Sequence, residues 1–236
     1  MTLQRLTASG GRSARDLVEG LRLREGVGGR PRVAAVMIAS ADGRAAVAGR
    51  STPLGHPDDR ALLRELRAQA DVVLVGTGTL AAERYGSLLD PDQRARRKAL
   101  GLPEHPPVAT ISRAMDVPDV PLLHEGVEVL AFTESDRRPP RGVTAVRLER
   151  VDLPAVLAEL GRRGLLGVTC EGGPGLLREV AAQGCLDDLL LTVAPLLAGG
   201  DEPSILAGAA LGPVRLRLAE VHRADDHLFL HYRPAA

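Results

Sequence analysis

Short apolar runs alternate with amphipathic segments along most of the chain, beginning near residue 32. The uninterrupted apolar run at 33–38 is typical of a strand that is covered on both faces, as in a parallel sheet. At 153–160 the apolar residues recur at positions i, i+3, i+4 and i+7, which predicts a helix with one core-facing stripe. Repeated signals of both kinds predict an α/β fold with a mostly parallel central sheet and helices on both faces.

The expected elements alternate between strands and helices with short connections. Strands are predicted near 33–38, 71–75, 108–111, 127–132, 143–148, 167–170 and 189–193, and helices near 57–69, near 153–160 and from Pro174 onward. The polar, arginine-rich stretch at 81–101 is assigned no element. In the last two segments, 214–221 and 228–232, apolar and polar residues alternate around a polar turn, which predicts an antiparallel hairpin at one sheet edge.

The first 30 residues differ from the rest of the chain. Residues 1–30 are polar and glycine-rich around one short amphipathic stretch, and we expect them to be an N-terminal extension. The remainder, 31–236, contains no internal repeat and no linker, which predicts one domain. A chain of 236 residues of which 44% are hydrophobic is long enough to bury one large core.

Charge and aromatic content exclude several classes of protein. Lys and Arg number 30 and Asp and Glu number 30, so the formal net charge is zero, which argues against a nucleic-acid or anionic-membrane surface. With no Trp and only two Phe, the chain has no stacking platform for single-stranded nucleic acid. No apolar run approaches the roughly 18 residues of a membrane span, and we expect a soluble, cytoplasmic protein. Cys170 and Cys185 lack metal-ligand spacing, so we expect two buried thiols and no metal site.

Two glycine-rich turns, each after a predicted buried strand, point to a phosphate-containing ligand. They are Gly76-Thr-Gly-Thr79 and Glu171-Gly-Gly-Pro-Gly175. Glycines let backbone N–H groups approach an anion, and the helix that follows presents its positive end to it. Two such turns predict one extended ligand across the carboxyl ends of parallel strands, as for a dinucleotide. For Thr79, contact with the ligand and a simple capping role both remain open.

A series of motifs appears in a fixed order along the chain. They are Ser40-Ala-Asp-Gly43, Leu66-Arg67, the turn at Gly76 with Glu83-Arg-Tyr-Gly86, the turn at Glu171, and Ala194-Pro195 with Gly199-Gly200. Over about 32–232 this series resembles the reductase domain of riboflavin biosynthesis. The resemblance implies a dihydrofolate-reductase-like fold and a homodimer. Residues 1–31 contain neither His nor Cys, so we expect a stand-alone reductase without the zinc deaminase domain of bifunctional relatives.

The resemblance implies hydride transfer from NADPH to the ribosyl C1 of an aminouracil or diaminopyrimidinone ribose phosphate. The residues that it assigns to the cofactor are Gly76, Thr79, Glu83, Gly172, Gly173, Pro174, Gly175 and Leu176. We add Ser112 and Arg113, because a hydroxyl and a cation after the strand at 108–111 suit a ribose 2′-phosphate and would select NADPH over NADH. An exposed arginine on a solvated turn is the alternative.

A second group of residues is expected to hold the substrate. Its members are Ser40, Asp42, Ser51, Arg67 and Glu171. Arg67 matches the substrate-phosphate position of the family, whereas Arg60 and Arg64 on the same predicted helix are expected to be solvated. Glu171 is the candidate catalytic residue, expected to orient substrate hydroxyls or pyrimidine N–H groups, with a capping role as the alternative.

The chain departs from the family at two places that bear on the substrate. Members that act on the uracil often carry a Lys at the position of Val36, and an acidic Asp-Pro pair at the position of Arg84-Tyr85. We therefore expect other residues to recognise the pyrimidine. Three alternatives stay open: a Rossmann dehydrogenase, because 76–81 fits G-x-G-x-x-A; another heterocycle reductase of dihydrofolate type, which needs only a different pocket; and a nucleotide-binding regulator without turnover.

Overall fold

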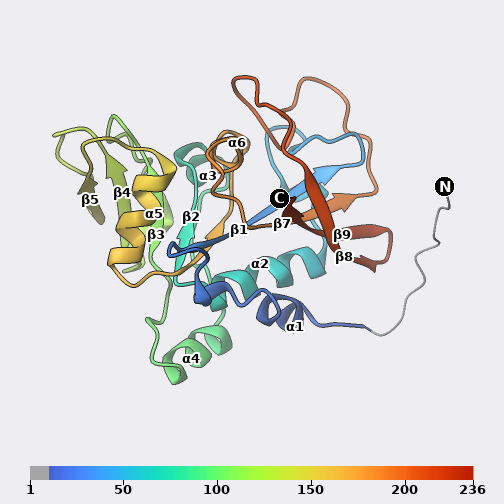
Figure 1. Ribbon diagram of the computed structural model, residues 1–236, viewed down its shortest axis with the longest axis horizontal. Helices are drawn as coiled ribbons and strands as arrows, with labels where there is room; N and C mark the ends of the chain where they lie inside the picture. Colours follow the sequence, from blue (N-terminus) through green and yellow to red (C-terminus); the bar gives the residue numbers. More distant parts are fainter. Residues whose placement is uncertain (1–10, 236) are drawn as a thin grey trace.

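A computed structural model describes residues 11–235 and contains one nine-stranded sheet (Figure 1). The strands are β1 (Arg32–Ser40), β2 (Val72–Leu74), β3 (Val108–Ile111), β4 (Val129–Thr133), β5 (Val143–Arg147), β6 (Gly167–Cys170), β7 (Asp188–Ala194), β8 (Leu216–Ala224) and β9 (His227–Pro234). Their order across the sheet is β5-β4-β3-β2-β6-β1-β7-β9-β8. Residues 1–10 of the predicted extension and residue 236 lie outside the described residues.

The pairing of the strands confirms the predicted sheet. All neighbours from β5 to β7 are parallel, whereas β7 with β9 and β9 with β8 are antiparallel. The predicted C-terminal hairpin therefore lies at one edge. A Rossmann sheet has the strand order 3-2-1-4-5-6, which this sheet lacks, so the Rossmann alternative is wrong.

Helices cover both faces of the sheet (Figure 1). They are α1 (Ala14–Glu19), α2 (Pro57–Gln69), α3 (Thr77–Ala82), α4 (Pro91–Ala99), α5 (Leu153–Arg162) and α6 (Pro174–Ala182), with 3₁₀ turns at Leu23–Glu25, Thr52–Leu54 and Pro121–His124. Alternate residues of β1 separate the two layers of core: Val33 and Ala35 pack with α5 and α6, whereas Ala34 and Val36 pack with α1 and α2. This alternation follows from the period of two in a strand and explains the uninterrupted apolar run.

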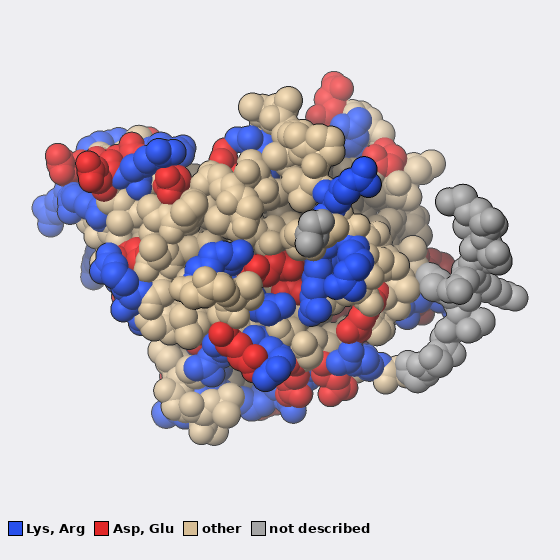
Figure 2. All heavy atoms as spheres, viewed as in Figure 1, with Lys and Arg blue, Asp and Glu red and all other residues tan. Residues whose placement is uncertain are grey.

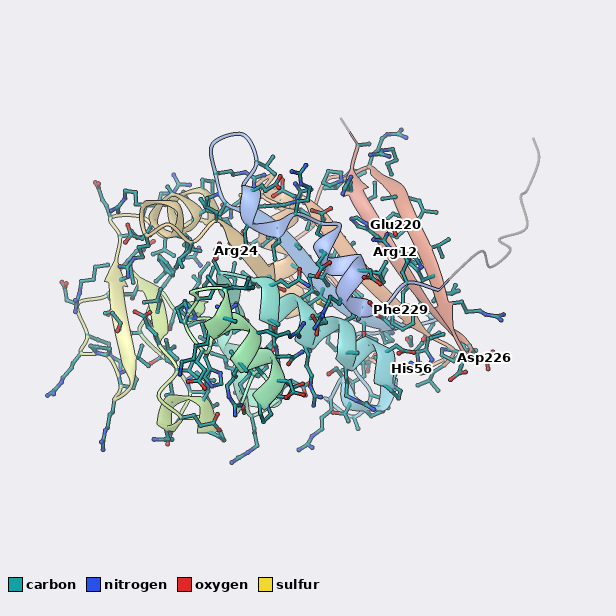
Figure 3. All side chains as sticks on the ribbon, turned by 90° about the horizontal axis from the view of Figure 1, so that it is seen from below. Arg12, Arg24, His56, Glu220, Asp226 and Phe229 are labelled. Carbon is teal, nitrogen blue, oxygen red and sulfur yellow. The ribbon has the colours of Figure 1, made fainter. Side chains whose placement is uncertain are left out.

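The segment at 11–30 adds to the core on the α2 side. Val18, Leu21 and Leu23 are buried there, and α1 packs on α2. Arg12, labelled in Figure 3, forms an ion pair of 3.0 Å with Glu220 of β8. The described part of the predicted extension is therefore packed against the sheet and the hairpin.

The α4 helix, in the stretch at 81–101, was not predicted from the sequence. Asp90 caps this helix, and Pro91 begins it. Arg97 is buried and donates hydrogen bonds to the carbonyl oxygens of Ala68 and Ala70, at 3.0 and 2.6 Å. A polar sequence hides this helix because its inward side chain is a guanidinium that binds backbone carbonyls rather than an apolar residue.

The surface agrees with the balanced charge of the sequence. On the face shown in Figure 2, basic and acidic side chains are interspersed. Over the described residues, no helix is both long and apolar enough to cross a membrane.

Candidate active site

The strand order brings the two glycine-rich turns together. Because β6 lies between β2 and β1 and runs parallel to both, the turns that leave β2 and β6 meet at the carboxyl edge of the sheet. The N–H of Gly76 donates to the carbonyl oxygen of Gly172 at 2.7 Å. Gly172 has φ +71°, and a Cβ there would lie 2.7 Å from the sulfur of Met37, so only glycine fits this position.

Gly173 also packs closely, against the protein itself. A Cβ at Gly173 would lie 2.7 Å from the Thr79 hydroxyl. A side chain at Gly173 would therefore clash within the protein itself, whether or not a ligand is bound. At Gly175 a Cβ would meet no atom within 4 Å, so the space beside the first turn of α6 is open.

The helices after the two turns begin without side-chain caps. Gly76 is the N-cap of α3 and Gly173 is the N-cap of α6, and neither makes a side-chain capping bond. Thr79 lies inside α3, so the alternative that Thr79 caps this helix is wrong. First-turn N–H groups without a capping side chain can bind an anion, and the helix dipole favours one there.

A cavity of about 770 Å³ opens where the turns meet. Sequence-predicted residues that line it are Ser51, Arg67, Gly76, Thr79, Glu83, Arg113, Glu171, Gly173, Pro174, Gly175 and Leu176. The α2 helix contributes Asp59, Leu63 and Arg67, which lie four residues apart on one face. Ser40, Asp42, Ser112 and Gly172, also predicted, are not among the lining residues.

Arg67, Glu171 and Tyr85 form a buried cluster in the wall of this cavity. The Nε and Nη2 of Arg67 each donate to one oxygen of Glu171 at 2.7 Å. The Tyr85 hydroxyl donates to Glu171 Oε2, and the Arg67 guanidinium lies 5.2 Å from the centre of the Tyr85 ring. The Glu171 side chain is 2% exposed, so this cluster supplies nearly all of its hydrogen bonds within the protein.

Electrostatics keeps Arg67 charged and the Tyr85 hydroxyl protonated. Burial opposes the charge of Arg67, but the carboxylate of Glu171 raises the pKa of Arg67. Burial and then the charge of Glu171 raise the pKa of Tyr85 well above its usual value, so its hydroxyl stays protonated and donates. The Nη1 of Arg67 donates only to the Leu88 carbonyl oxygen, at 3.5 Å, and is the nitrogen left for a ligand.

Ser51 and Glu83 are also brought together at the cavity. The Ser51 hydroxyl donates to Glu83 Oε1 at 2.8 Å, and the Ser51 N–H donates to the same oxygen at 3.2 Å. This contact joins the end of α3 to the segment that precedes α2. It closes one side of the cavity between a residue predicted for the substrate and one predicted for the cofactor.

The remaining predicted residues divide between the cavity and its supports. Arg113 is exposed, lines the cavity and donates to the Val151 carbonyl oxygen at 3.2 Å, whereas Ser112 is buried. Asp42 accepts hydrogen bonds from the Ser40 hydroxyl and from the N–H groups of Ala198 and Gly199. These bonds lower the pKa of Asp42 and tie the turn after β1 to the segment after β7.

The exposure of two arginines and the burial of two cysteines agree with the sequence analysis. Arg60 and Arg64 are exposed, as expected. Cys170 and Cys185 are buried free thiols, and burial raises the pKa of Cys170 to about 12. Over the described residues, no group of His, Cys, Asp and Glu side chains has the arrangement of a metal site.

Asp59 and the contact of Tyr85 with Glu171 are functional features that were not predicted from the sequence. The spacing of four residues between Asp59, Leu63 and Arg67 is the signal that places Asp59 on the same helix face as Arg67. Tyr85 was noted only as a departure from the family pattern. Its role depends on Glu171, which is 86 residues away in the sequence.

Comparisons with known proteins agree with this geometry. The RibD C-terminal domain matches residues 31–230. The 2,5-diamino-6-ribosylamino-4(3H)-pyrimidinone 5′-phosphate reductase of Methanothermobacter thermautotrophicus is 27% identical over 207 residues, which are 81% of this chain and 92% of that protein.

Two solved structures show the fold. A pyrimidine reductase-like protein from Corynebacterium diphtheriae superposes with a TM-score of 0.81 at 23% identity, over 95% of this chain and 100% of that one. Dihydrofolate reductase from Enterococcus faecalis, solved with NADP(H), gives a TM-score of 0.50 at 15% identity, over 87% and 97%. The predicted dihydrofolate-reductase-like fold is confirmed, and the chain belongs to the RibD C-terminal domain family.

Proposed function

We propose that this protein is an NADPH-dependent reductase of riboflavin biosynthesis that transfers hydride to the ribosyl C1 of an aminopyrimidine ribose 5-phosphate. One observation carries this proposal: a single cavity is lined both by two uncapped helix N-termini and by the buried Arg67–Glu171 pair. The first part suits a dinucleotide and the second suits a polar heterocycle. The Methanothermobacter relative is named as a reductase of such a pyrimidinone.

NADPH fits the turn at the start of α6. The space beside Gly175 is open, and the N–H groups there lack a side-chain cap, so a pyrophosphate can approach the backbone. Arg113 lies on the lining of the same cavity and would pair with the 2′-phosphate. The nicotinamide supplies the hydride when the cofactor is bound.

The protein's own contribution is to hold the substrate rather than to move protons. Glu171 already accepts three hydrogen bonds, two from Arg67 and one from Tyr85, which hold its carboxyl group in one orientation. A carboxylate has about four acceptor sites, so about one remains for a substrate hydroxyl or N–H. An imine conjugated to an aminopyrimidine can take its proton from solvent, and the residues of the cavity then align the sugar carbon with the nicotinamide.

A regulator without turnover would need only the phosphate-binding turns. The further polar residues that line the cavity, Arg67 and Ser51 among them, favour an enzyme. The experiment measures NADPH oxidation by the purified protein with the aminouracil ribose phosphate, with its 2-amino counterpart and with dihydrofolate. We expect turnover of at least one ribose phosphate and none of dihydrofolate; turnover of dihydrofolate alone would overturn the proposal.

We also propose that the protein is a homodimer that covers the edge hairpin. Leu218 of β8 is 46% exposed, and Leu197, in the segment after β7, is 78% exposed. Apolar residues beside an open sheet edge favour association. Light scattering at micromolar concentration should give the mass of two chains, and a charge at Leu218 (L218E) should shift it to that of one.

A further inference from the structure

Asp59 is a partly buried carboxylate in the cavity that the mechanism above does not use. It lies in the first turn of α2, about one helical turn before Leu63 and two turns before Arg67. All three side chains are on the same helix face and line the cavity. The Thr192 hydroxyl, from β7, donates to Asp59 Oδ1 at 2.6 Å. Thr192 is itself buried, so this bond holds the Asp59 carboxylate in a fixed position against the sheet.

No cation of the described chain neutralises Asp59. The nearby His56 contacts Asp58 and Asp225 instead, and Arg60 of the next helix position is exposed. Of the other carboxylates that line the cavity, Glu171, Glu179 and Asp152 each form an ion pair with an arginine, whereas Glu83, like Asp59, accepts a hydrogen bond from a hydroxyl group, that of Ser51. Burial raises the pKa of Asp59, with the Thr192 bond and the charges of His227, Arg60 and His56 acting against it.

The surroundings of Asp59 suit one edge of a flat ring. Ile38 and Val36 of β1 and Leu63 of α2 line the cavity, and Ile38 pairs in register with Thr192. An apolar wall excludes water, which strengthens hydrogen bonds to the carboxylate. A buried carboxylate without a cation is costly unless donors reach it, so a ligand with two adjacent N–H donors would complete this site.

The two candidate substrates differ in what they would present to such a carboxylate. A 2-amino-4-oxopyrimidine carries the N3–H beside the 2-amino group, which are two donors in parallel. The corresponding uracil carries the N3–H beside the C2 carbonyl, so one oxygen of the carboxylate would face another acceptor. A carboxylate oxygen that faces the C2 carbonyl oxygen of the uracil has no hydrogen to accept, so this site would bind the uracil more weakly than the 2-amino compound.

We propose that Asp59, oriented by Thr192, is the specificity-determining residue that binds the N3–H and 2-amino group of a non-deaminated 2-amino-4-oxopyrimidine. This inference rests on the proposed function, since it names the substrate class of the same cavity. The reduction of the sugar would then take place before removal of the 2-amino group, and a deaminating reaction would have to consume the product.

Asparagine at this position gives a sharp test. The ratio of kcat/KM for the 2-amino and uracil ribose phosphates is measured for the natural protein and for Asp59→Asn. We expect the natural protein to favour the 2-amino compound by about 10- to 100-fold, the loss of one charge-assisted bond. In Asp59→Asn the amide offers one acceptor and one donor, which match the uracil edge, so the preference should shift toward the uracil by a similar factor.

A neighbouring acid and a binding measurement complete the design. Asp58→Asn removes the same charge one residue away, at an exposed position, and should leave the ratio unchanged. Calorimetry with the free bases, triaminopyrimidinone and diaminouracil, tests the selectivity of the natural protein without turnover and without a variant. Equal binding of both bases, or an equal loss for both substrates in Asp59→Asn, would overturn the role of Asp59. Failure to reduce either ribose phosphate, with selective binding of the triamino base, would overturn the proposed function alone.

Discussion

Arg67 and Glu171, 104 residues apart in the sequence, meet through two hydrogen bonds of 2.7 Å in the cavity wall. A pair of parallel N–H to oxygen bonds fixes both side chains in one plane and is stronger than a single-point contact. Tyr85 adds a third bond to the same carboxylate. The pair therefore positions Glu171 and, through it, any substrate group that the carboxylate accepts.

Glu171→Gln should lower kcat/KM for the ribose phosphate substrate by roughly 10- to 100-fold, the loss of one or two charge-assisted bonds. The variant should not remove a limb of the pH–rate profile, because Glu171 orients the substrate and exchanges no proton. Tyr85→Phe is the matched control, because it removes one hydrogen bond to Glu171 but keeps the ion pair of Glu171 with Arg67. It should lower kcat/KM by a smaller factor than Glu171→Gln does. A steep acid limb of the natural enzyme that vanishes in Glu171→Gln would mean that Glu171 is a general acid–base catalyst.

Arg113→Ala should weaken NADPH binding by about 1.5–3 kcal/mol, the scale of a charge-assisted hydrogen bond, and leave NADH binding nearly unchanged. The reason is that only NADPH carries the 2′-phosphate. Fluorescence titration of both cofactors measures the effect. Arg137→Ala is the control, because Arg137 pairs with Asp116 and does not line the cavity. Equal losses of binding free energy for NADPH and NADH would show that Arg113 does not bind the 2′-phosphate.

Gly175→Val should block or strongly weaken NADPH binding without unfolding the protein. A Cβ at Gly175 meets no protein atom within 4 Å, so the new side chain starts in open space, where the pyrophosphate is expected. Thermal melting of the free protein and titration with NADPH separate the two effects. Gly212→Val, where a Cβ also meets nothing and which lies outside the cavity lining, should change neither. If Gly175→Val binds NADPH with normal affinity, the turn at Gly175 does not contact the cofactor.

The buried carboxylate of Asp188 should make the fold sensitive to acid. Burial alone would raise its pKa, but bonds from His231, Arg233 and Arg32, at 2.8, 2.9 and 2.8 Å, lower it to about 2. An unfolded Asp titrates near about 3.9, so this stabilisation is complete above that pH and is lost as the pH falls toward about 2. It amounts to on the order of 2 kcal/mol.

Urea unfolding of the natural protein and of Asp188→Asn between neutral pH and about pH 3 tests this, the lower limit lying inside the window set by the two pKa values. The natural protein should lose more stability on acidification than the variant does. Asp136→Asn is the control, because the Asp136 side chain is fully exposed. Parallel pH dependence of the natural protein and Asp188→Asn would contradict the assignment.

The alternation of apolar runs was enough to predict the sheet, its hairpin and the helices α2, α5 and α6, because the period of a strand or helix is a local property. The α4 helix escaped this reasoning, since buried Arg97 binds backbone carbonyls and leaves no apolar stripe. The two turns could be recognised from their glycines. That Gly76 and Gly172 touch follows only from the insertion of β6 between β2 and β1.

The site was predictable to a smaller extent for the same reason. Sequence motifs identify which residues are unusual, but not which of them are already paired within the protein. Asp42 was expected at the substrate and is bound instead to Ser40 and the segment after β7. Asp59 is one of two adjacent acids in the first turn of α2, and only its bond to Thr192 and its place in the cavity distinguish it from Asp58.

Hydride transfer to the sugar carbon is the central claim, and isotopic labelling tests it most directly. The protein is incubated with an aminopyrimidine ribose 5-phosphate and NADPH that carries deuterium at C4 of the nicotinamide, once with each face labelled. Mass spectrometry and NMR of the product should show one deuterium at C1 of a ribityl chain, from one of the two labelled cofactors only. Oxidation of NADPH without deuterium at that carbon, or no oxidation with either the uracil or the 2-amino substrate, would contradict the account.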